Sequence, residues 1–303
     1  MEVRKISFVG EFTKLYNEEG IARSFEELGI EVQRFPEFDF QYDKAVQEIE
    51  EFKPDLILFA KLQIPNKERF LSLMKGRGIP TASWTFDLYF GLRRESYLET
   101  DPIFRADFVF GPDGGHDKEF KEKGINYHLL RQGIYGGFCY KGIKEENYPY
   151  DIIFTGSVNK QWLYREEMAG FLSSNYNFKW IGKKIGDKEI RGKGLNDLYA
   201  SAKIIMGDSV YSSHYWSNRI YETLGRGGFI IHPQVEGLEN DYIPYKHYIP
   251  YPFGNWDKLK EKIDYFLPRE KEREAIALAG MEHTKNNHTL VHRCRQLLDV
   301  VNA

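Results

Sequence analysis

The sequence predicts an α/β protein made of two halves, each a parallel β-sheet covered by helices. Its length of 303 residues exceeds the roughly 100–200 residues of one typical domain. Short apolar runs alternate with amphipathic segments, which is the pattern of successive β-α units in a parallel sheet. The alternation stops in the loop-rich stretch 131–150 and then begins again. We therefore expect two Rossmann-like domains, at residues 1–145 and 146–303, that face a central cleft.

In the first half, each expected element follows from its apolar pattern. Helix 18–29, for example, places Ile21, Phe25 and Leu28 on one face and ends at Gly29. The pattern predicts strands at 5–10, 30–35, 55–60, 79–84, 106–111 and 125–130. It predicts the other helices of this half at 42–53, 66–78 and 117–124.

In the second half, the same rhythm predicts four strands, and the chain then becomes helical from Trp256 onward. The strands are expected at 151–157, 177–182, 203–208 and 228–233. Helices are expected at 164–174, 194–202, 217–225, 256–267, 269–286 and 289–301. Ligands of such sheets bind at the carboxyl ends of the strands, so we look for functional residues there.

Composition argues against some classes of partner. The net charge is −3, whereas a bulk nucleic-acid binder usually has a basic domain. No apolar run approaches the ~20 residues that cross a bilayer, and the first residues lead into a strand instead of a signal peptide. Cys139 and Cys294 lack the spacing of a metal or redox motif. We expect a cytoplasmic protein with reduced thiols.

The stretch 214–233 carries the strongest functional signal. Ser217 is placed to cap a short helix, and Arg219 falls in its first turn, where unpaired backbone N–H groups favour an anion. Glu222 follows one turn later on the same face, and its carboxylate can accept two sugar hydroxyls. The pair suits a ligand that carries both phosphate and ribose. The alternative is a surface ion pair between the two side chains.

Two turns support a phosphate-bearing ligand. The first strand of the second half ends in Gly156 and Ser157, a turn of the kind that admits phosphate to a sheet edge, although an ordinary turn glycine has the same pattern. Lys183 and Lys184 follow the next strand, where they either pair with a diphosphate or form a solvated turn. The segment 225–228, Gly-Arg-Gly-Gly, allows close approach of helix and strand.

The second half resembles the C-terminal domain of GT-B glycosyltransferases, specifically the spore-maturation CgeB-like group with its "glycosyl transferases group 1" domain. The segments that carry the resemblance are 198–209, 217–233, 256–267 and 277–298. In the first half, residues 8–29 resemble the opening strand, loop and helix of that family, and 84–88 resembles its Trp-x-x-Asp segment. The resemblance implies a GT-B fold whose final helices cross back onto the first half.

The resemblance also implies glycosyl transfer, with the nucleotide-sugar donor, UDP-linked by preference, in the second half and the acceptor in the first. It assigns Arg219 to the donor diphosphate and Glu222 to the ribose. The other donor-side residues that it implies are Gly156, Ser157 and Lys183 near the phosphates or base, and Tyr215, Trp216, Ser217 and Asn218 near the sugar. The acceptor-side residues are Gly10, Glu11 and Trp84.

One departure from the family leaves the stereochemistry of transfer open. Related retaining enzymes carry an acidic residue seven positions before the ribose glutamate, and this sequence has no carboxylate between Val210 and Glu222. Inverting transfer needs a base that deprotonates the acceptor hydroxyl. Asp87, which follows a strand and has aromatic neighbours, is the predicted base, although it could instead cap a helix. Glu11 and Asp113 are weaker candidates.

Neither a metal nor a cofactor beyond the nucleotide sugar is expected, since the sequence contains no Asp-x-Asp pair to hold a divalent cation. The acceptor is left open between a glycan, a lipid-linked saccharide, a protein and a modified DNA base. The alternatives are a glycosyltransferase for hydroxymethyl-pyrimidine in DNA, a non-catalytic sugar-nucleotide binding protein, and a sugar-nucleotide epimerase.

Overall fold

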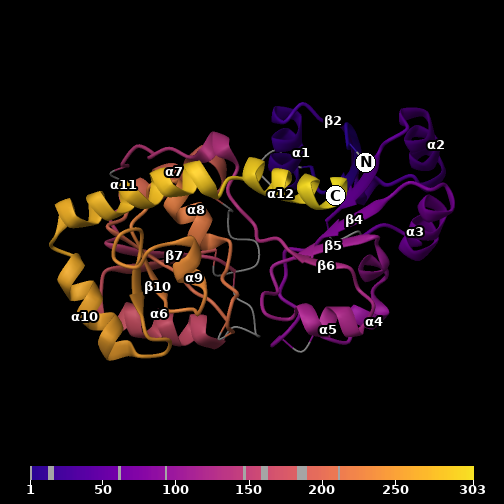
Figure 1. Cartoon of the computed structure of the whole chain (residues 1–303). Helices are drawn as coiled ribbons and strands as arrows, with labels where there is room; N and C mark the ends of the chain where they lie inside the picture. The colour runs from indigo at the N-terminus through magenta and orange to yellow at the C-terminus, as the bar shows by residue number, and fades with distance from the viewer. Residues whose placement is uncertain are drawn as a thin grey trace. The chain divides into compact units, whose positions relative to one another are not determined.

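The chain forms two compact units, which we call unit 1 and unit 2 (Figure 1). Unit 1 consists of Met1–Tyr135 with Leu290–Ala303, and unit 2 of Gly136–Thr289. The structure is a computed structural model. It describes residues 2–12, 17–60, 63–92, 94–145, 148–157, 163–182, 190–210 and 212–303.

Unit 1 contains a six-stranded sheet in which every pair of neighbouring strands is parallel, in the order β2-β1-β3-β4-β5-β6. Its central strands β3 and β4 are buried along their whole length, which explains why β3 is an unbroken apolar run. The strands are β1 (Lys5–Gly10), β2 (Glu31–Pro36), β3 (Leu56–Phe59), β4 (Thr81–Trp84), β5 (Phe108–Gly111) and β6 (Tyr127–Leu129).

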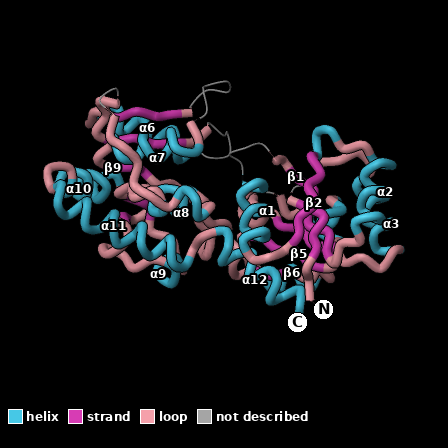
Figure 2. The backbone as a smooth tube through the Cα atoms, turned by 90° about the horizontal axis from the view of Figure 1, so that it is seen from above, coloured by secondary structure: helices cyan, strands magenta, loops and turns pink. Residues whose placement is uncertain are grey.

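Helices cover both faces of this sheet (Figure 2). One face packs against α1 (Asn17–Glu27) and α12 (Leu290–Asn302), so the last helix of the chain completes the core of the first unit. The two helices lie so close at Gly20 that a Cβ there would be 2.8 Å from the Leu290 side chain, and glycine permits this approach. On the other face lie α2 (Tyr42–Phe52), α3 (Lys67–Gly76), the short α4 (Tyr97–Thr100) and α5 (Asp117–Glu122).

Unit 2 contains a five-stranded parallel sheet in the order β11-β10-β9-β7-β8. Its strands are β7 (Ile152–Thr155), β8 (Phe178–Ile181), β9 (Ile204–Met206), β10 (Ile230–Pro233) and β11 (Ile249–Tyr251). Its helices are α6 (Leu163–Asn175), α7 (Gly192–Ser201), α8 (Arg219–Gly225), α9 (Leu238–Asp241), α10 (Trp256–Phe266) and α11 (Glu270–Asn287). Two parallel-sheet α/β units were predicted, and the structure confirms this fold class. The edge strand β11 and helix α9 lie where the sequence analysis assigned no element.

The strand order of unit 2 reverses between β7 and β9, because the chain first adds β8 on one side and then β9, β10 and β11 on the other. The corresponding reversal in unit 1 lies between β1 and β3. Open α/β sheets bind ligands outside the carboxyl ends of the strands at such switch points. None of the helices in the described part of the chain is long and apolar enough to cross a membrane.

Candidate functional site

Three charged side chains meet at the switch point of unit 2, and we call them the Arg–Asp–Arg cluster: Arg165, Asp208 and Arg219. Asp208, two residues after β9, is fully buried and forms ion pairs with both arginines. Arg165 comes from α6 and Arg219 is the first residue of α8. The two guanidinium groups are also largely buried, with 9% and 12% of their side chains exposed. One carboxylate therefore binds two buried cations.

Backbone and aromatic contacts fix the orientation of both guanidinium groups. Arg219 Nε donates to the carbonyl of Thr155 at 2.6 Å, and its Nη1 donates to Ser217 Oγ at 3.2 Å. Arg165 Nη1 donates to the carbonyl of Ser157 at 2.8 Å. Both guanidinium groups lie over the ring of Phe154, at 4.6 Å for Arg219 and 5.7 Å for Arg165. The cluster is thus held at the end of β7 before any ligand binds.

The cluster carries surplus positive charge in a buried place. Burial, together with the charge of the neighbouring Arg165, lowers the pKa of Arg219 to about 9. Burial also lowers the pKa of Arg165 to about 10. Both side chains still carry a proton at neutral pH, so the three groups sum to one net positive charge. A net positive charge of this kind favours a bound anion.

Gly156 brings the backbone against this cluster. Its φ is +155°, and a Cβ there would lie 2.6 Å from Arg219 Nη2. A side chain at this position would therefore collide with the guanidinium group, which a glycine avoids. Gly156 and Arg219, both expected on the donor side, therefore lie side by side, and the carbonyl of the next residue, Ser157, accepts from Arg165.

Glu222 lies on α8, but Arg219 is not its partner. Its Oε2 accepts from Arg226 at 2.8 and 2.9 Å, one turn further along the helix. Arg226 is buried, donates to the carbonyl of Gly192 and the side chain of Asn196, and lies over the ring of Phe138 at 4.6 Å. The alternative of an Arg219–Glu222 surface ion pair is wrong, since each of the two residues pairs with another group.

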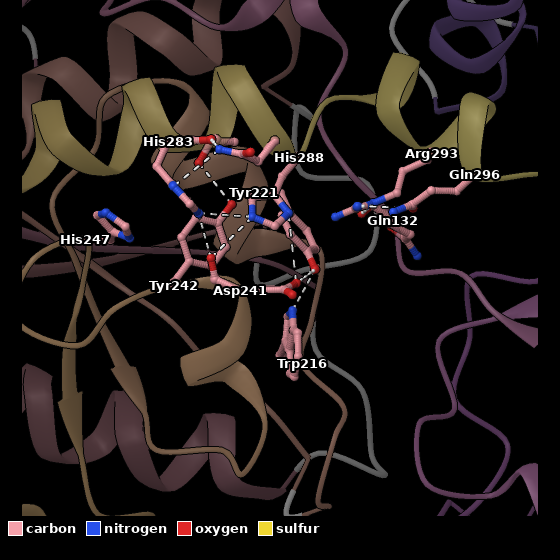
Figure 3. A network of polar contacts seen from close by, with 12 residues as sticks. Gln132, Trp216, Tyr221, Asp241, Tyr242, His247, His283, His288, Arg293 and Gln296 are labelled. Carbon is pink, nitrogen blue, oxygen red and sulfur yellow. Dashed lines mark hydrogen bonds and ion pairs between the residues drawn. The ribbon is translucent and has the colours of Figure 1, made fainter.

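Trp216, in the segment before α8, lies in the core of unit 2 instead of lining a sugar site. Trp216 is 4% exposed and belongs to an apolar core with Ile220 and Leu224. Figure 3 shows its Nε1 donating to Tyr221 OH at 2.8 Å, and that hydroxyl donating to Asp241 Oδ2 at 3.0 Å. Trp216 therefore anchors the segment from within the core.

The other predicted residues of this segment lie at or near the start of α8. Tyr215 is also largely buried, and its carbonyl accepts from Ser209 Oγ at 3.1 Å. The structure corrects one detail, since α8 has Asn218 as its N-cap residue. Ser217, one position earlier, nevertheless accepts the Arg219 backbone N–H at 3.2 Å through its hydroxyl.

Asn218 Oδ1 and His232 Nε2 are among the buried acceptor atoms that have no hydrogen-bond partner in the part of the chain that the structure describes. His232 ends the apolar run of β10, and its Nδ1 lies 2.7 Å from the carbonyl of Pro233, so Nδ1 carries the proton and Nε2 a lone pair. Burial lowers the His232 pKa to about 4, and Arg219 contributes in the same direction. Buried polar atoms are almost always paired, so these two are suited to ligand hydroxyls.

The predicted acceptor-side residues lie at the carboxyl edge of the unit 1 sheet. Gly10 ends β1 at the switch point, with Glu11 next to it, and Trp84 ends β4 with its ring buried in the core. Asp87 lies in the loop after β4 with 54% of its side chain exposed, 3.7 Å from Arg94. It does not cap a helix, because the next helix begins at Tyr97.

Sequence reasoning missed Arg165 and Asp208. The signal for Asp208 was a buried carboxylate directly after an apolar strand, in the run Ile-Ile-Met-Gly-Asp (204–208). Arg165 carried no such signal, since it falls on the charged side of an amphipathic helix. Lys183 and Lys184 lie outside the described residues. Within those residues, no group of three or more His, Cys, Asp or Glu side chains is placed to hold a metal ion.

Comparison with solved structures defines the class of fold. Sucrose-phosphate synthase from Thermosynechococcus elongatus is 12% identical, with a TM-score of 0.67 over 99% of this chain and 98% of that chain. HepE from Anabaena, in complex with UDP and glucose, is 13% identical, with a TM-score of 0.64 over 99% of each chain. OtsA is 9% identical, with a TM-score of 0.68 over 99% of each chain. The protein has the GT-B fold.

The family follows from the sequence of the second half. Residues 146–299, just over half of the chain, match the family described as glycosyl transferase-like. The chain belongs to this family and is a glycosyltransferase. A comparison with curated proteins finds no match.

Proposed function

We propose that this glycosyltransferase moves a sugar from a UDP-linked donor to an acceptor hydroxyl without a metal ion. The observation that carries the proposal is the Arg–Asp–Arg cluster, because it offers surplus buried positive charge beside a glycine turn at the switch point of unit 2. A diphosphate would neutralise that charge. During transfer, the same cations would stabilise the negative charge that develops on the phosphate oxygen of the leaving nucleoside diphosphate.

The remaining donor contacts follow from the chemistry of the neighbouring side chains. Glu222 binds the ribose hydroxyls, since a carboxylate offers about four acceptor positions and Arg226 occupies only part of them. Asn218 Oδ1 and His232 Nε2 accept from hydroxyls of the transferred sugar. The structures of HepE with UDP and with UDP-glucose support uridine as the base.

Asp87 is the proposed base on the acceptor side. The acceptor oxygen forms a bond to the anomeric carbon of the donor, while the bond from that carbon to the diphosphate oxygen breaks. Asp87 takes the proton of the acceptor hydroxyl, and the nucleoside diphosphate leaves with the bonding electrons. The acceptor belongs to a glycan, a lipid-linked saccharide or a protein.

A thermal-shift comparison tests the donor site first. We expect UDP and UDP-sugars to raise the melting temperature more than GDP, ADP, CMP or TDP, because a ligand that binds only the native state stabilises it. Release of UDP from a UDP-sugar, measured with and without a panel of acceptor saccharides, then tests transfer. If no nucleotide raises the melting temperature and no UDP is released from any UDP-sugar, the proposal is overturned.

A further inference from the structure

Asp113 is a buried carboxyl group at the carboxyl edge of the unit 1 sheet, two residues after β5. The residue is 1% exposed. Its Oδ1 accepts the backbone N–H groups of Tyr89 and Phe90, both at 2.9 Å. These two residues follow Asp87 in the loop after β4. A single carboxylate oxygen therefore anchors the loop that carries the proposed base.

Other contacts also hold the same loop. Gln132 Nε2 donates to the carbonyl of Phe86 at 2.9 Å. The His116 ring stacks on Phe90 with ring centres 4.0 Å apart and planes inclined by 8°. The carbonyl of Asp113 itself accepts from Tyr127 OH at 3.2 Å, which fixes the backbone of Asp113 to β6.

The second oxygen of Asp113, Oδ2, is buried and has no hydrogen-bond partner among the residues that the structure describes. Burying a carboxylate with only one oxygen bonded disfavours its ionised form. Burial therefore raises the pKa of Asp113 to about 6, the charge of Asp87 contributes in the same direction, and the two backbone N–H groups and His116 oppose the shift.

We propose that Asp113 is a positioning residue for the loop around Asp87, and that ionised Asp113 holds this loop in the arrangement that transfers sugar. A carboxylate oxygen accepts backbone N–H bonds roughly twice as strongly as a neutral group does, so protonation of Asp113 loosens the anchor at Tyr89 and Phe90. The charged or titratable groups that face Asp113 are Asp87 and Tyr89 on the loop itself, His116 before α5 and Tyr127 on β6. The effect on transfer rests on the proposed function.

NMR of the full chain, labelled with 15N-tyrosine and 15N-phenylalanine, tests the anchor without any substrate. Between pH 5 and 8 we expect the amide signals of Tyr89 and Phe90 to titrate together, with a midpoint near pH 6. In Asp113→Asn this titration step of the two amide signals should vanish. Both amides should stay hydrogen bonded, because the carboxamide oxygen still accepts. His116→Phe keeps a ring against Phe90 but removes the imidazole. Loss of the step in that variant, or its persistence in Asp113→Asn, would overturn the proposal.

The pH profile of transfer tests the positioning role. From pH 6 to pH 5, kcat/KM of the wild type should fall about five- to sixfold, because the ionised fraction of a single essential group with a pKa of about 6 falls by that factor over this interval. Asp113→Asn should show less than a twofold decrease over the same interval, with an unchanged Kd for UDP. Identical profiles in the two proteins would overturn the positioning role. If the amide signals titrate as expected but the protein transfers sugar to no acceptor, the proposed function is refuted and the role of Asp113 as an anchor of the loop still holds.

Discussion

Arg219 and Asp208 form an ion pair that is almost completely enclosed, although one begins helix α8 and the other follows strand β9. The carboxylate also binds Arg165, which α6 contributes. A carboxylate shared by two guanidinium groups cannot neutralise both. The pair therefore orients Arg219, and the two arginines and one carboxylate together carry one net positive charge.

The first prediction concerns the stability of the cluster. Asp208→Asn removes the carboxylate that Arg165 and Arg219 share, and both buried cations lose that partner. Breaking a buried pair in this way typically destabilises a protein by about 3–5 kcal/mol. Urea unfolding of the purified variant measures the loss. Asp264→Asn, which removes a half-exposed partner of Lys260, is the matched control and should unfold nearly as the wild type does. Equal unfolding midpoints for both variants would refute the structural importance of the cluster.

The second prediction concerns Arg219 and the diphosphate. Arg219→Ala should weaken UDP binding by about 10- to 100-fold, the equivalent of a charge-assisted hydrogen bond of ~1.5–3 kcal/mol. Binding of uridine, which has no phosphate, should change little. Isothermal titration calorimetry on protein with verified folding gives both affinities. Arg269→Ala, an exposed arginine of the same unit, serves as the control. An equal loss for UDP and uridine would mean that Arg219 acts only on the fold.

The third prediction concerns Glu222 and the ribose. Glu222→Gln should weaken UDP binding by roughly tenfold, because the carboxamide accepts hydroxyl hydrogens less strongly than a carboxylate. The same substitution should have little effect on binding of 2′-deoxy-UDP, which lacks one of the two hydroxyls. This comparison isolates the interaction between side chain and ribose. If the substitution weakens both ligands equally, Glu222 serves only to hold Arg226.

The fourth prediction concerns catalysis. Asp87→Asn should lower kcat by about 10²–10⁴-fold, the usual contribution of a general base, while the Kd for UDP stays within twofold of the wild type. Because the Asp87 side chain is half exposed and 3.7 Å from Arg94, the substitution should leave the fold intact. Arg94→Gln, which removes the neighbouring charge but not the carboxylate, should retain most of the rate. A wild-type kcat in Asp87→Asn would exclude Asp87 as the base.

The fifth prediction concerns pH and His232. Its folded pKa of about 4 lies below the unfolded value of 6.5, so the unfolded chain binds more protons between these values. The stability contributed by neutral His232 is present above pH 6.5 and is lost as the pH falls toward 4. Linkage gives a loss of about 2 kcal/mol between pH 7 and 5.

His232→Asn isolates this contribution, because its amide nitrogen can replace the Nδ1 donor to Pro233. The variant should lose less free energy of unfolding than the wild type between pH 7 and 5, as measured by urea unfolding at each pH. Parallel losses in the two proteins would show that His232 is not responsible for the acid sensitivity.

Local patterns predicted much of the fold. The apolar periodicity of β1, α1 and β4 requires only neighbours in the sequence, and these elements lie where the pattern put them. The segment 234–255 gave no such signal, because α9 and β11 are only four and three residues long. Helix α12 has a clear amphipathic pattern, but its place in the core of unit 1 follows from packing against α1.

For the site, the sequence by itself determined the chemical types: a glycine turn after β7, an arginine and a glutamate on one short helix, and acidic residues after strands. Only the tertiary structure decided the partners. Asp208 and Arg165 are 43 residues apart in the sequence, and they meet because β7 and β9 are neighbours in the sheet. Charge pairing depends on the order of strands and on burial, and neither is encoded in the spacing of residues along the chain. That is why the sequence assigned Glu222 a possible partner in Arg219, whereas the folded protein pairs Glu222 with Arg226 and Arg219 with Asp208.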